Sequence, residues 1–178
     1  HKSDCEKLFY LADNFNAATY PKEKGMCWEE KNAIYKHTVS CSSLQCIDLN
    51  KIRSKKFKVV VDAVNGAGAL ALPTMLDMLG CEVIKLDCEP SGVFNRGTEP
   101  LPENLKTLSQ NVIQNNADVG FAVDPDADRL AVVDENGTPL GEEYSLVLAA
   151  DGYINFLKVE KETFVSNLST SLALDKLA

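Results

Sequence analysis

The sequence predicts a small α/β domain over residues 49–156, and three observations lead to that prediction. Short runs rich in β-branched residues alternate with longer segments whose apolar residues recur at helical spacing. Glycines and prolines separate the two kinds of segment. The chain of 178 residues, with 45% hydrophobic and 25% charged residues, also has the size and composition of a folded globular protein.

The first half of this domain has the pattern of a strand, a helix and a second strand. Residues 57–63, FKVVVDA, form a nearly continuous apolar run, as in a parallel strand covered on both faces. A glycine-rich turn then opens a helix within 65–80, which Gly80 ends and in which Pro73 suits the first turns. Its apolar face is expected to comprise Leu72, Met75, Leu76 and Leu79. Residues 81–87, CEVIKLD, predict the second strand and a right-handed crossover.

The second half repeats the alternation. Residues 102–116 predict a helix whose buried face comprises Leu105, Leu108, Val112 and Ile113. Residues 117–123, ADVGFAV, predict a third strand. RLAVVD and TPLG flank an Asn-Gly turn, which favours a tight hairpin. A last helix is expected within 141–156, with Leu146, Val147 and Ala150 directed inward.

The flanking segments are less regular. Residues 1–48 are polar, with a possible helix in 5–15 and with Trp28 and Tyr35 as expected packing anchors. Residues 162–167 predict a strand, and 169–178 a helix opened by a serine or threonine cap. Because the sequence begins at His1 rather than Met and ends within this pattern, we expect it to be part of a longer protein.

Charge and composition exclude several classes of protein. A formal net charge of -8 argues against a nucleic-acid partner, and we interpret the basic cluster KIRSKKFK, 51–58, as a solvated lead-in to the first strand. No apolar run approaches the roughly 18 residues of a membrane span. Six cysteines without a CxxC pair, and two histidines, form no zinc motif, so we expect a reduced, cytoplasmic protein.

The most informative stretch is FAVDPDADRL, in which three aspartates follow the third strand. Asp124, Asp126 and Asp128 lie where open α/β sheets bind ligands, beyond the carboxyl end of a strand. Three carboxylates in one turn repel each other, and Mg²⁺ would resolve the repulsion while keeping open coordination positions. Arg129 could hold a phosphate that the cation also holds. The alternative is a solvated acidic turn that Arg129 neutralises.

Other families also use closely spaced aspartates. An EF-hand is excluded, because Arg129 stands at the sixth position, where that loop needs glycine, although Glu135 fits the twelfth. A haloacid-dehalogenase-like phosphotransferase would use Asp124 as nucleophile, but it expects Thr or Val where Asp128 stands. That enzyme and a non-catalytic cation-binding module remain alternatives. Gly66 and Gly68 could form a phosphate-binding turn, or could serve only helix–strand packing.

The aspartate loop and its surroundings resemble the α-D-phosphohexomutases, the superfamily of phosphoglucomutase, phosphomannomutase and phosphoglucosamine mutase. The resemblance rests on DPDADRL with the following DENGTPL and GEEYSLVLAAD. It extends from about residue 33 to 178 through FKVVVDAVNGAGALALPTMLDMLGCEVIKLD, PSGVFNRGTEPLPENL and FVSNLSTSLALDKLA, in that order.

The resemblance implies a three-layer α/β/α domain on a mixed, mostly parallel four-stranded sheet. Residues 1–48 would be the tail of the first mutase domain, 49–156 the second, metal-binding domain, and 157–178 the start of the third. Asp124, Asp126 and Asp128 would ligate Mg²⁺ together with a phosphoserine oxygen, and Arg129 would assist catalytically at that phosphoryl group. Phosphate would move between the 1- and 6-positions of a sugar phosphate, with the remaining mutase domains as partners.

Two departures from the family pattern matter. The family's serine lies in a motif like T-A-S-H-N-P, which does not occur in this sequence, so we expect these 178 residues alone to be inactive. Pro125 stands at the loop position where the family usually has glycine.

Overall fold

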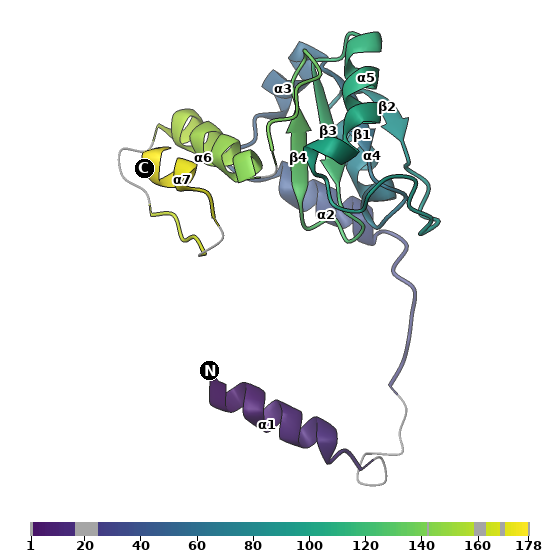
Figure 1. The fold of residues 1–178 in the computed structure, drawn as a ribbon, viewed down its shortest axis with the longest axis vertical. Coiled ribbons are helices and arrows are strands. Elements are labelled where there is room, and N and C mark those ends of the chain that lie inside the picture. The colour runs from purple at the N-terminus through teal and green to yellow at the C-terminus, as the bar shows by residue number, and fades with distance from the viewer. Residues whose placement is uncertain (1, 17–24, 142, 159–162, 168–169, 178) are drawn as a thin grey trace. The chain divides into compact units, whose positions relative to one another are not determined.

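The structure, a computed structural model, describes residues 2–16, 25–141, 143–158, 163–167 and 170–177. The chain divides into two compact units, 1–31 and 32–178. Figure 1 labels their helices and strands. In chain order these are α1 (Lys2–Asp13), α2 (Ala33–Ser42), α3 (Leu49–Lys55), β1 (Lys58–Asp62), α4 (Gly68–Met78), β2 (Glu82–Leu86), the 3₁₀ turn η2 (Pro102–Asn104), α5 (Lys106–Gln114), β3 (Val119–Val123), β4 (Leu130–Val133), α6 (Glu143–Leu157) and α7 (Leu172–Leu177).

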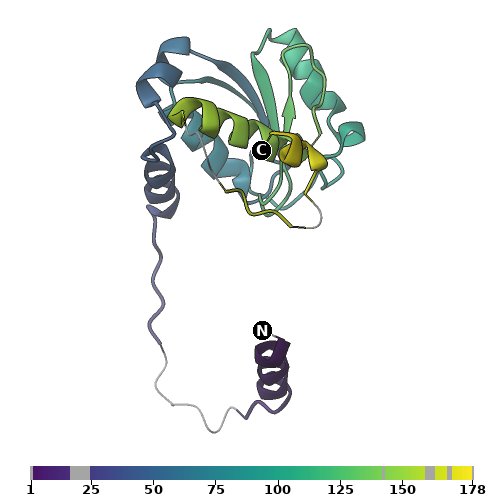
Figure 2. The same ribbon diagram turned by 90° about the vertical axis from the view of Figure 1, so that its left-hand side faces the viewer.

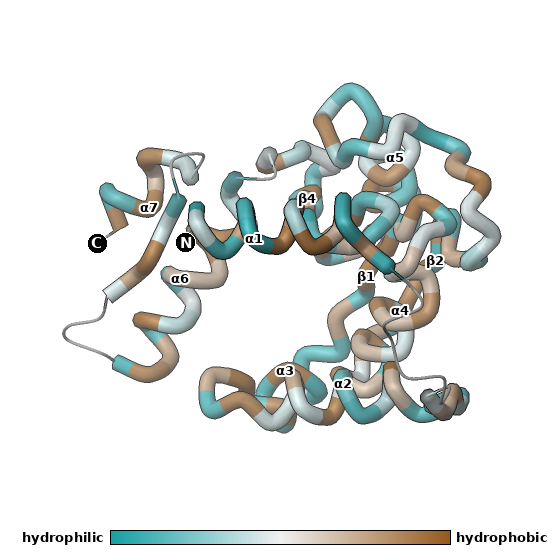
Figure 3. The backbone as a smooth tube through the Cα atoms, turned by 90° about the horizontal axis from the view of Figure 1, so that it is seen from below, coloured by the Kyte–Doolittle hydropathy of each residue, from teal (hydrophilic) through white to brown (hydrophobic). Residues whose placement is uncertain are grey.

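The first unit contains α1, the helix expected near the start of the chain. Figure 3 shows both hydrophilic and hydrophobic residues along it. None of its residues is buried. Trp28, in the same unit, is 76% exposed, and Tyr35 of α2 is 59% exposed. The prediction that these two aromatic residues are packing anchors is therefore wrong.

The second unit is built on a four-stranded sheet in the order β2-β1-β3-β4. β1 runs parallel to both β2 and β3, and β4 returns antiparallel to β3. The predicted mixed, mostly parallel sheet is thus confirmed. The Asn-Gly turn after β4 forms, but only one bridge, Val133 with Pro139, extends the pairing beyond it.

Helices cover both faces of the sheet, so the domain has the predicted three layers. Because side chains alternate along a strand, Val60 of β1 faces α5, whereas Val59 and Val61 face α4. α5 contributes Leu108 and Val112 to its side of the core, and Leu105, just before α5, joins them; all three are fully buried. α6 packs beside β4 and is followed by α7 (Figure 2).

The sequence misplaced some residues of the helices. Leu146 of α6 and Ile113 of α5 were expected to face inward, yet they are 46% and 54% exposed, while Val147 is half-buried and Ala150 is buried. Both exposed residues lie at the edge of the buried face of their helix, since that face covers only part of the helix circumference. Pro73 lies inside α4, in the second of its turns.

The basic cluster 51–58 is mostly exposed and precedes β1, as expected of a solvated lead-in, but it is largely helical. Most of the basic cluster forms the end of α3, which Asp48 caps by accepting a hydrogen bond from the backbone N–H of Lys51 at 2.9 Å. The expected strand at 162–167 is absent from its described part, 163–167. The following helix forms as α7, and the Ser171 hydroxyl accepts a bond from the N–H of Ala173. Residues 162, 169 and 178 of these predictions lie outside the described residues.

Candidate metal centre

The aspartates lie in the loop 124–129, which joins β3 to β4 and which we call the metal loop. Pairing between Val123 and Leu130 closes it, because these residues form the last rung of the antiparallel pair. It therefore lies at the carboxyl ends of β1, β2 and β3, the edge at which open α/β sheets bind ligands. The structure confirms the strand-to-loop transition that the sequence indicated.

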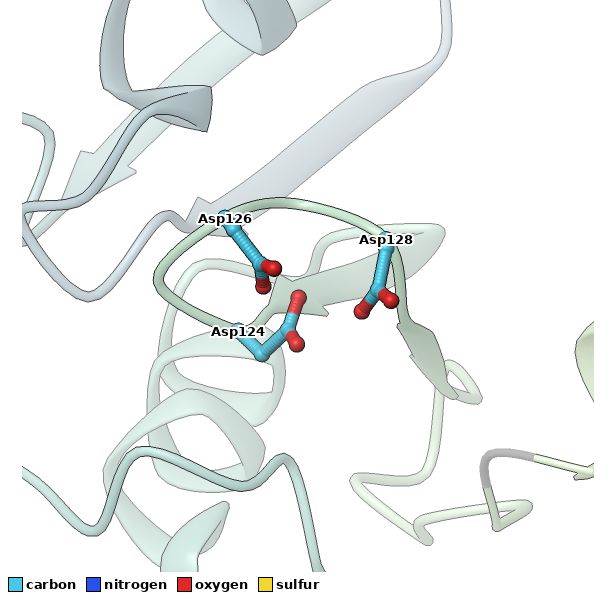
Figure 4. Close-up of side chains that lie close together, drawn as sticks. All are labelled: Asp124, Asp126 and Asp128. Carbon is cyan, nitrogen blue, oxygen red and sulfur yellow. The ribbon is translucent and has the colours of Figure 1, made fainter. Parts of the chain in front are cut away.

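The metal loop brings the three carboxylates together. Asp124 is 5% exposed, whereas Asp126 and Asp128 are exposed to solvent. One oxygen of each carboxylate lies within 4.8 Å of those of the other two, and the three side chains converge in Figure 4. The backbone N–H of Arg129 donates to Asp124 Oδ1 at 3.1 Å, and that of Ala127 donates to the Asp124 carbonyl at 3.1 Å. These bonds tie the curled loop to its one buried aspartate.

The glycine-rich turn after β1 contacts the backbone of the metal loop. The N–H of Ala67 donates to the carbonyl of Pro125 at 2.8 Å. A Cβ at Gly66 would lie 2.4 Å from the same carbonyl oxygen, so only glycine fits this approach. This contact favours the interpretation that Gly66 serves packing between the helix and the strand. Pro125, which stands where the family usually has glycine, accepts the hydrogen bond from Ala67 through its carbonyl oxygen.

A buried ion pair joins the ends of β1 and β3. Arg96 Nε donates to Asp62 Oδ2 at 2.8 Å, and the two side chains are 10% and 3% exposed. Arg96 Nη2 donates to the carbonyl of Val123 at 2.7 Å, one residue before Asp124. Asp62 Oδ1 accepts the N–H of Val64 at 2.9 Å. The pair thus links the loops after all three parallel strands.

Arg129 lies at the other end of the metal loop. Its guanidinium donates through Nη1 to Glu99 Oε2, and both side chains are nearly half exposed. Asp128 and Arg129 also line an open cleft of about 340 Å³ with Glu143, Ser145, Asn167 and Ser171. A guanidinium beside carboxylates in such a cleft could hold an anion that a bound cation also contacts.

The carboxylates influence one another's protonation. The pKa of Asp128 is raised by its hydrogen bond with the Asp124 carboxyl and by the negative charges of Asp126 and Asp124. Burial would raise the pKa of Asp124, but the Arg129 N–H and the side-chain hydrogen bonds with Asp128 and Asp126 lower it overall. A proton on Asp128 therefore relieves part of the repulsion within the cluster.

The cluster fits a small divalent cation. Oxygen ligands about 2.1 Å from Mg²⁺ in an octahedron are about 3.0 Å apart when adjacent and about 4.2 Å when opposite. The 4.8 Å limit on the carboxylate oxygens is close to these values, and the two exposed aspartates can rotate. The hard oxygen donors match the preference of Mg²⁺ and Ca²⁺. A bound cation would offset the same repulsion among the carboxylates that raises the pKa of Asp128.

Replacing Asp128 by asparagine is expected to stabilise the metal-free protein at neutral pH. Because folding raises the pKa of Asp128, this carboxyl contributes stability only while protonated and loses that contribution as pH rises through its folded pKa. Asp128→Asn should therefore raise Tm in EDTA at about pH 7, and the gain should shrink toward about pH 3, where Asp128 is protonated. Asp77→Asn, in an exposed part of α4, provides the control. A gain that is equal at both pH values would contradict the assignment.

The fold and the cluster together define a class of protein, a three-layer α/β domain with a candidate cation site at the carboxyl ends of its parallel strands. The model of the family described as phosphoglucomutase/phosphomannomutase, alpha/beta/alpha domain II, matches residues 35–137, more than half of the chain. The chain belongs to this family, as the sequence resemblance predicted.

Individual relatives agree with the family. The chain is 34% identical over 178 residues to a phosphoglucomutase/phosphomannomutase of Thermococcus kodakarensis, covering 97% of this chain and 37% of that protein. It is 44% identical over 119 residues to a probable phosphoglucosamine mutase of Pyrococcus horikoshii, covering 67% of this chain and 26% of that protein. The chain thus spans less than two fifths of the length of either relative.

Solved structures share the fold. A putative phosphomannomutase from Thermus thermophilus superposes with a TM-score of 0.65 at 25% identity, over 82% of this chain and 33% of that one. A phosphoglucomutase/phosphomannomutase family protein from Burkholderia thailandensis superposes with a TM-score of 0.62 at 24% identity, over 86% of this chain and 32% of that one. None of the helices that the structure describes is both long and apolar enough to cross a membrane.

Two residues around the metal loop were not predicted from the sequence. Arg96 and Glu99 lie between β2 and η2, far along the chain from the aspartates, yet each contacts one end of the loop. An arginine in a loop rich in glycine and proline is the local signal in the sequence, and nothing in the spacing indicates its partners.

Proposed function

We propose that residues 49–156 are the Mg²⁺-binding domain of a hexose-phosphate mutase, with Asp124, Asp126 and Asp128 as the metal ligands. The convergence of three carboxylates in the loop after β3 carries this proposal. It is supported by membership in a family whose named relatives are phosphoglucomutases, phosphomannomutases and phosphoglucosamine mutases. That membership favours a mutase over a haloacid-dehalogenase-like phosphotransferase with Asp124 as nucleophile.

The aspartates and Arg129 would have different roles at a phosphoryl group. When bound, Mg²⁺ supplies Lewis-acid polarisation of a phosphoryl oxygen. Asp124 is held by the Arg129 N–H, so it would be the fixed ligand, whereas the exposed Asp126 and Asp128 would complete the protein's share of the ligands. The Arg129 guanidinium, which lines the adjacent cleft, would orient the phosphoryl group through hydrogen bonds as the catalytic residue.

The remaining segments would belong to neighbouring parts of the mutase. We assign residues 1–48 to the tail of the first domain and its linker, and 157–178 to the start of the third domain. The substrate would be a sugar phosphate, the partners the other mutase domains, and the location the cytoplasm. No serine motif of the kind that carries the transferred phosphate occurs in the 178 residues.

We therefore expect the 178-residue chain to have no mutase activity by itself, even with a sugar 1,6-bisphosphate activator. The reason is that the cation site would lack the phosphorylated serine and the sugar-binding loops of the other domains. A coupled assay of hexose 1-phosphate and 6-phosphate interconversion tests this. Turnover above the rate without protein would show that catalytic groups have been misassigned.

Metal binding itself is tested by titrating the chain with Mg²⁺ and following backbone amide NMR shifts. We expect saturable shifts centred on 123–130, because the ligands lie within this loop. Asp126→Asn should weaken binding by about 10- to 100-fold, since it removes one of three charged ligands.

The matched control is Asp77→Asn, which removes one negative charge from exposed α4 and should leave the affinity unchanged. Equal weakening by both variants would indicate general electrostatics instead of coordination. Saturable binding that Asp126→Asn leaves intact would argue against the proposed ligand set. Metal binding without turnover of any sugar phosphate, even after the other domains are supplied, would favour the non-catalytic module.

A further inference from the structure

The guanidinium of Arg96 contacts the backbone immediately before the metal loop. It comes from the segment between β2 and η2, and its side chain is 10% exposed. We infer that Arg96 is a positioning residue for the metal loop, setting where Asp124 lies relative to the sheet. This inference rests on the proposed metal site and adds to it a residue outside the ligand set.

The contacts of Arg96 explain how it could act. Nη2 donates to the carbonyl of Val123 at 2.7 Å, and Nε donates to Asp62 Oδ2 at 2.8 Å. Nη1 donates to the carbonyl of Gly97 at 2.9 Å, which holds the guanidinium against its own segment. The planar fork of arginine permits these three directions at once. The end of β3 is thereby fixed to the end of β1.

Asp62 is itself held in place, so it anchors the Arg96 guanidinium that donates to the Val123 carbonyl. It is 2% exposed at the end of β1, and its Oδ1 accepts the N–H of Val64. The first residue after Val123 is Asp124, the buried member of the carboxylate cluster. A shift of the Val123 carbonyl would therefore move the one aspartate that cannot adjust by rotating in solvent.

The same segment also reaches the other end of the metal loop. Glu99 accepts a hydrogen bond from Arg129, the last residue of the loop, and the Glu99 carbonyl accepts one from Asn104 Nδ2 at 2.8 Å. Residues 96–99 thus contact both ends of the loop. The exposed Glu99–Arg129 pair is the weaker of the two contacts, because solvent screens it.

Arg96→Lys is the informative variant. A lysine ammonium can keep the ion pair with Asp62 and so preserve the fold, but it cannot also reproduce the forked donation to Val123. Arg53→Lys is the matched control, since Arg53 donates through Nε and Nη2 to one carbonyl, that of Met78, at 3.0 and 2.7 Å. That contact joins α3 to the end of α4 and touches no residue of the metal loop.

Two measurements on the 178-residue chain test the inference. The first is amide hydrogen exchange by NMR without metal, at the N–H groups of Ala127 and Arg129, which both bond to Asp124. The second is the Kd for Mn²⁺ from electron paramagnetic resonance. Arg96→Lys is expected to speed exchange at both amides and to raise the Mn²⁺ Kd about 10-fold, as for partners that orient metal ligands. Arg53→Lys should change neither.

Each result decides a separate claim. Unchanged exchange at both amides in Arg96→Lys would overturn the inference, whatever the metal does. Faster exchange with an unchanged Mn²⁺ Kd would also overturn it, because the loop would then move without consequence for the ligands. Equal effects of Arg53→Lys would attribute the change to general destabilisation. If wild type does not bind Mn²⁺ saturably while Arg96→Lys alone speeds exchange, the proposed metal site fails and control of loop geometry by Arg96 stands.

Discussion

Arg96→Met is expected to lower the free energy of unfolding by about 3–5 kcal/mol, the usual cost of removing one partner of a buried ion pair. The methionine would leave the Asp62 carboxylate, 3% exposed, without its guanidinium. It would also leave the Val123 carbonyl without the donor at 2.7 Å. Urea unfolding followed by circular dichroism measures the loss as a fall in the midpoint.

The double variant Asp62→Asn/Arg96→Met is the control for this interpretation. Asparagine removes the unpaired charge yet keeps an oxygen that can accept the N–H of Val64. The double variant should therefore be more stable than Arg96→Met alone, because most of the cost lies in the buried charge. A loss below about 1 kcal/mol in Arg96→Met, the range of exposed pairs, would mean that solvent reaches the pair.

Leu108→Ala is expected to cost about 2–5 kcal/mol, as for other leucines removed from a close-packed core. Leu108 is fully buried between α5 and the sheet. It packs on Gly120 of β3, where an added Cβ would lie 3.1 Å from Leu108 Cδ1 and 2.8 Å from Val112 Cγ2. The loss would again be measured by urea unfolding.

Ile113→Ala serves as the matched control on the same helix. Ile113 is 54% exposed, so its removal should change the stability by only about 0.5 kcal/mol. Gly120→Ala should destabilise wild type through overpacking, and Leu108→Ala should relieve that cost only in part, because the contact with Val112 Cγ2 remains. Equal costs for Leu108→Ala and Ile113→Ala would show that α5 does not pack as described.

The alternation of strands and helices was predictable because burial imposes a local period. Val59, Val60 and Val61 read as a strand covered on both faces, and that is how β1 lies between α4 and α5. The aspartates were also predictable as a group, since their spacing places them in one turn after β3. Their metal-binding role remains a prediction from that spacing and from the family.

What the sequence could not predict depends on contacts between distant segments. Arg96 meets Asp62 across 34 residues and Val123 across 27, and no periodic pattern encodes such distances. Apolar residues at the margin of a helix face, such as Leu146 and Ile113, are ambiguous for a different reason. Their burial depends on whether a neighbouring element covers that margin, which spacing within one helix does not reveal.

The closure of the metal loop affects the thermodynamics of any ion that it takes up. Val123 and Leu130 pair across its base, and Asp124 is bonded to two backbone N–H groups within it. The loop backbone is thus ordered when the chain folds. The conformational entropy of the loop is therefore lost during folding and not when the ion binds. Only the side chains of Asp126 and Asp128 remain to be immobilised. Association should therefore resemble docking to a preorganised site, with little change in the backbone.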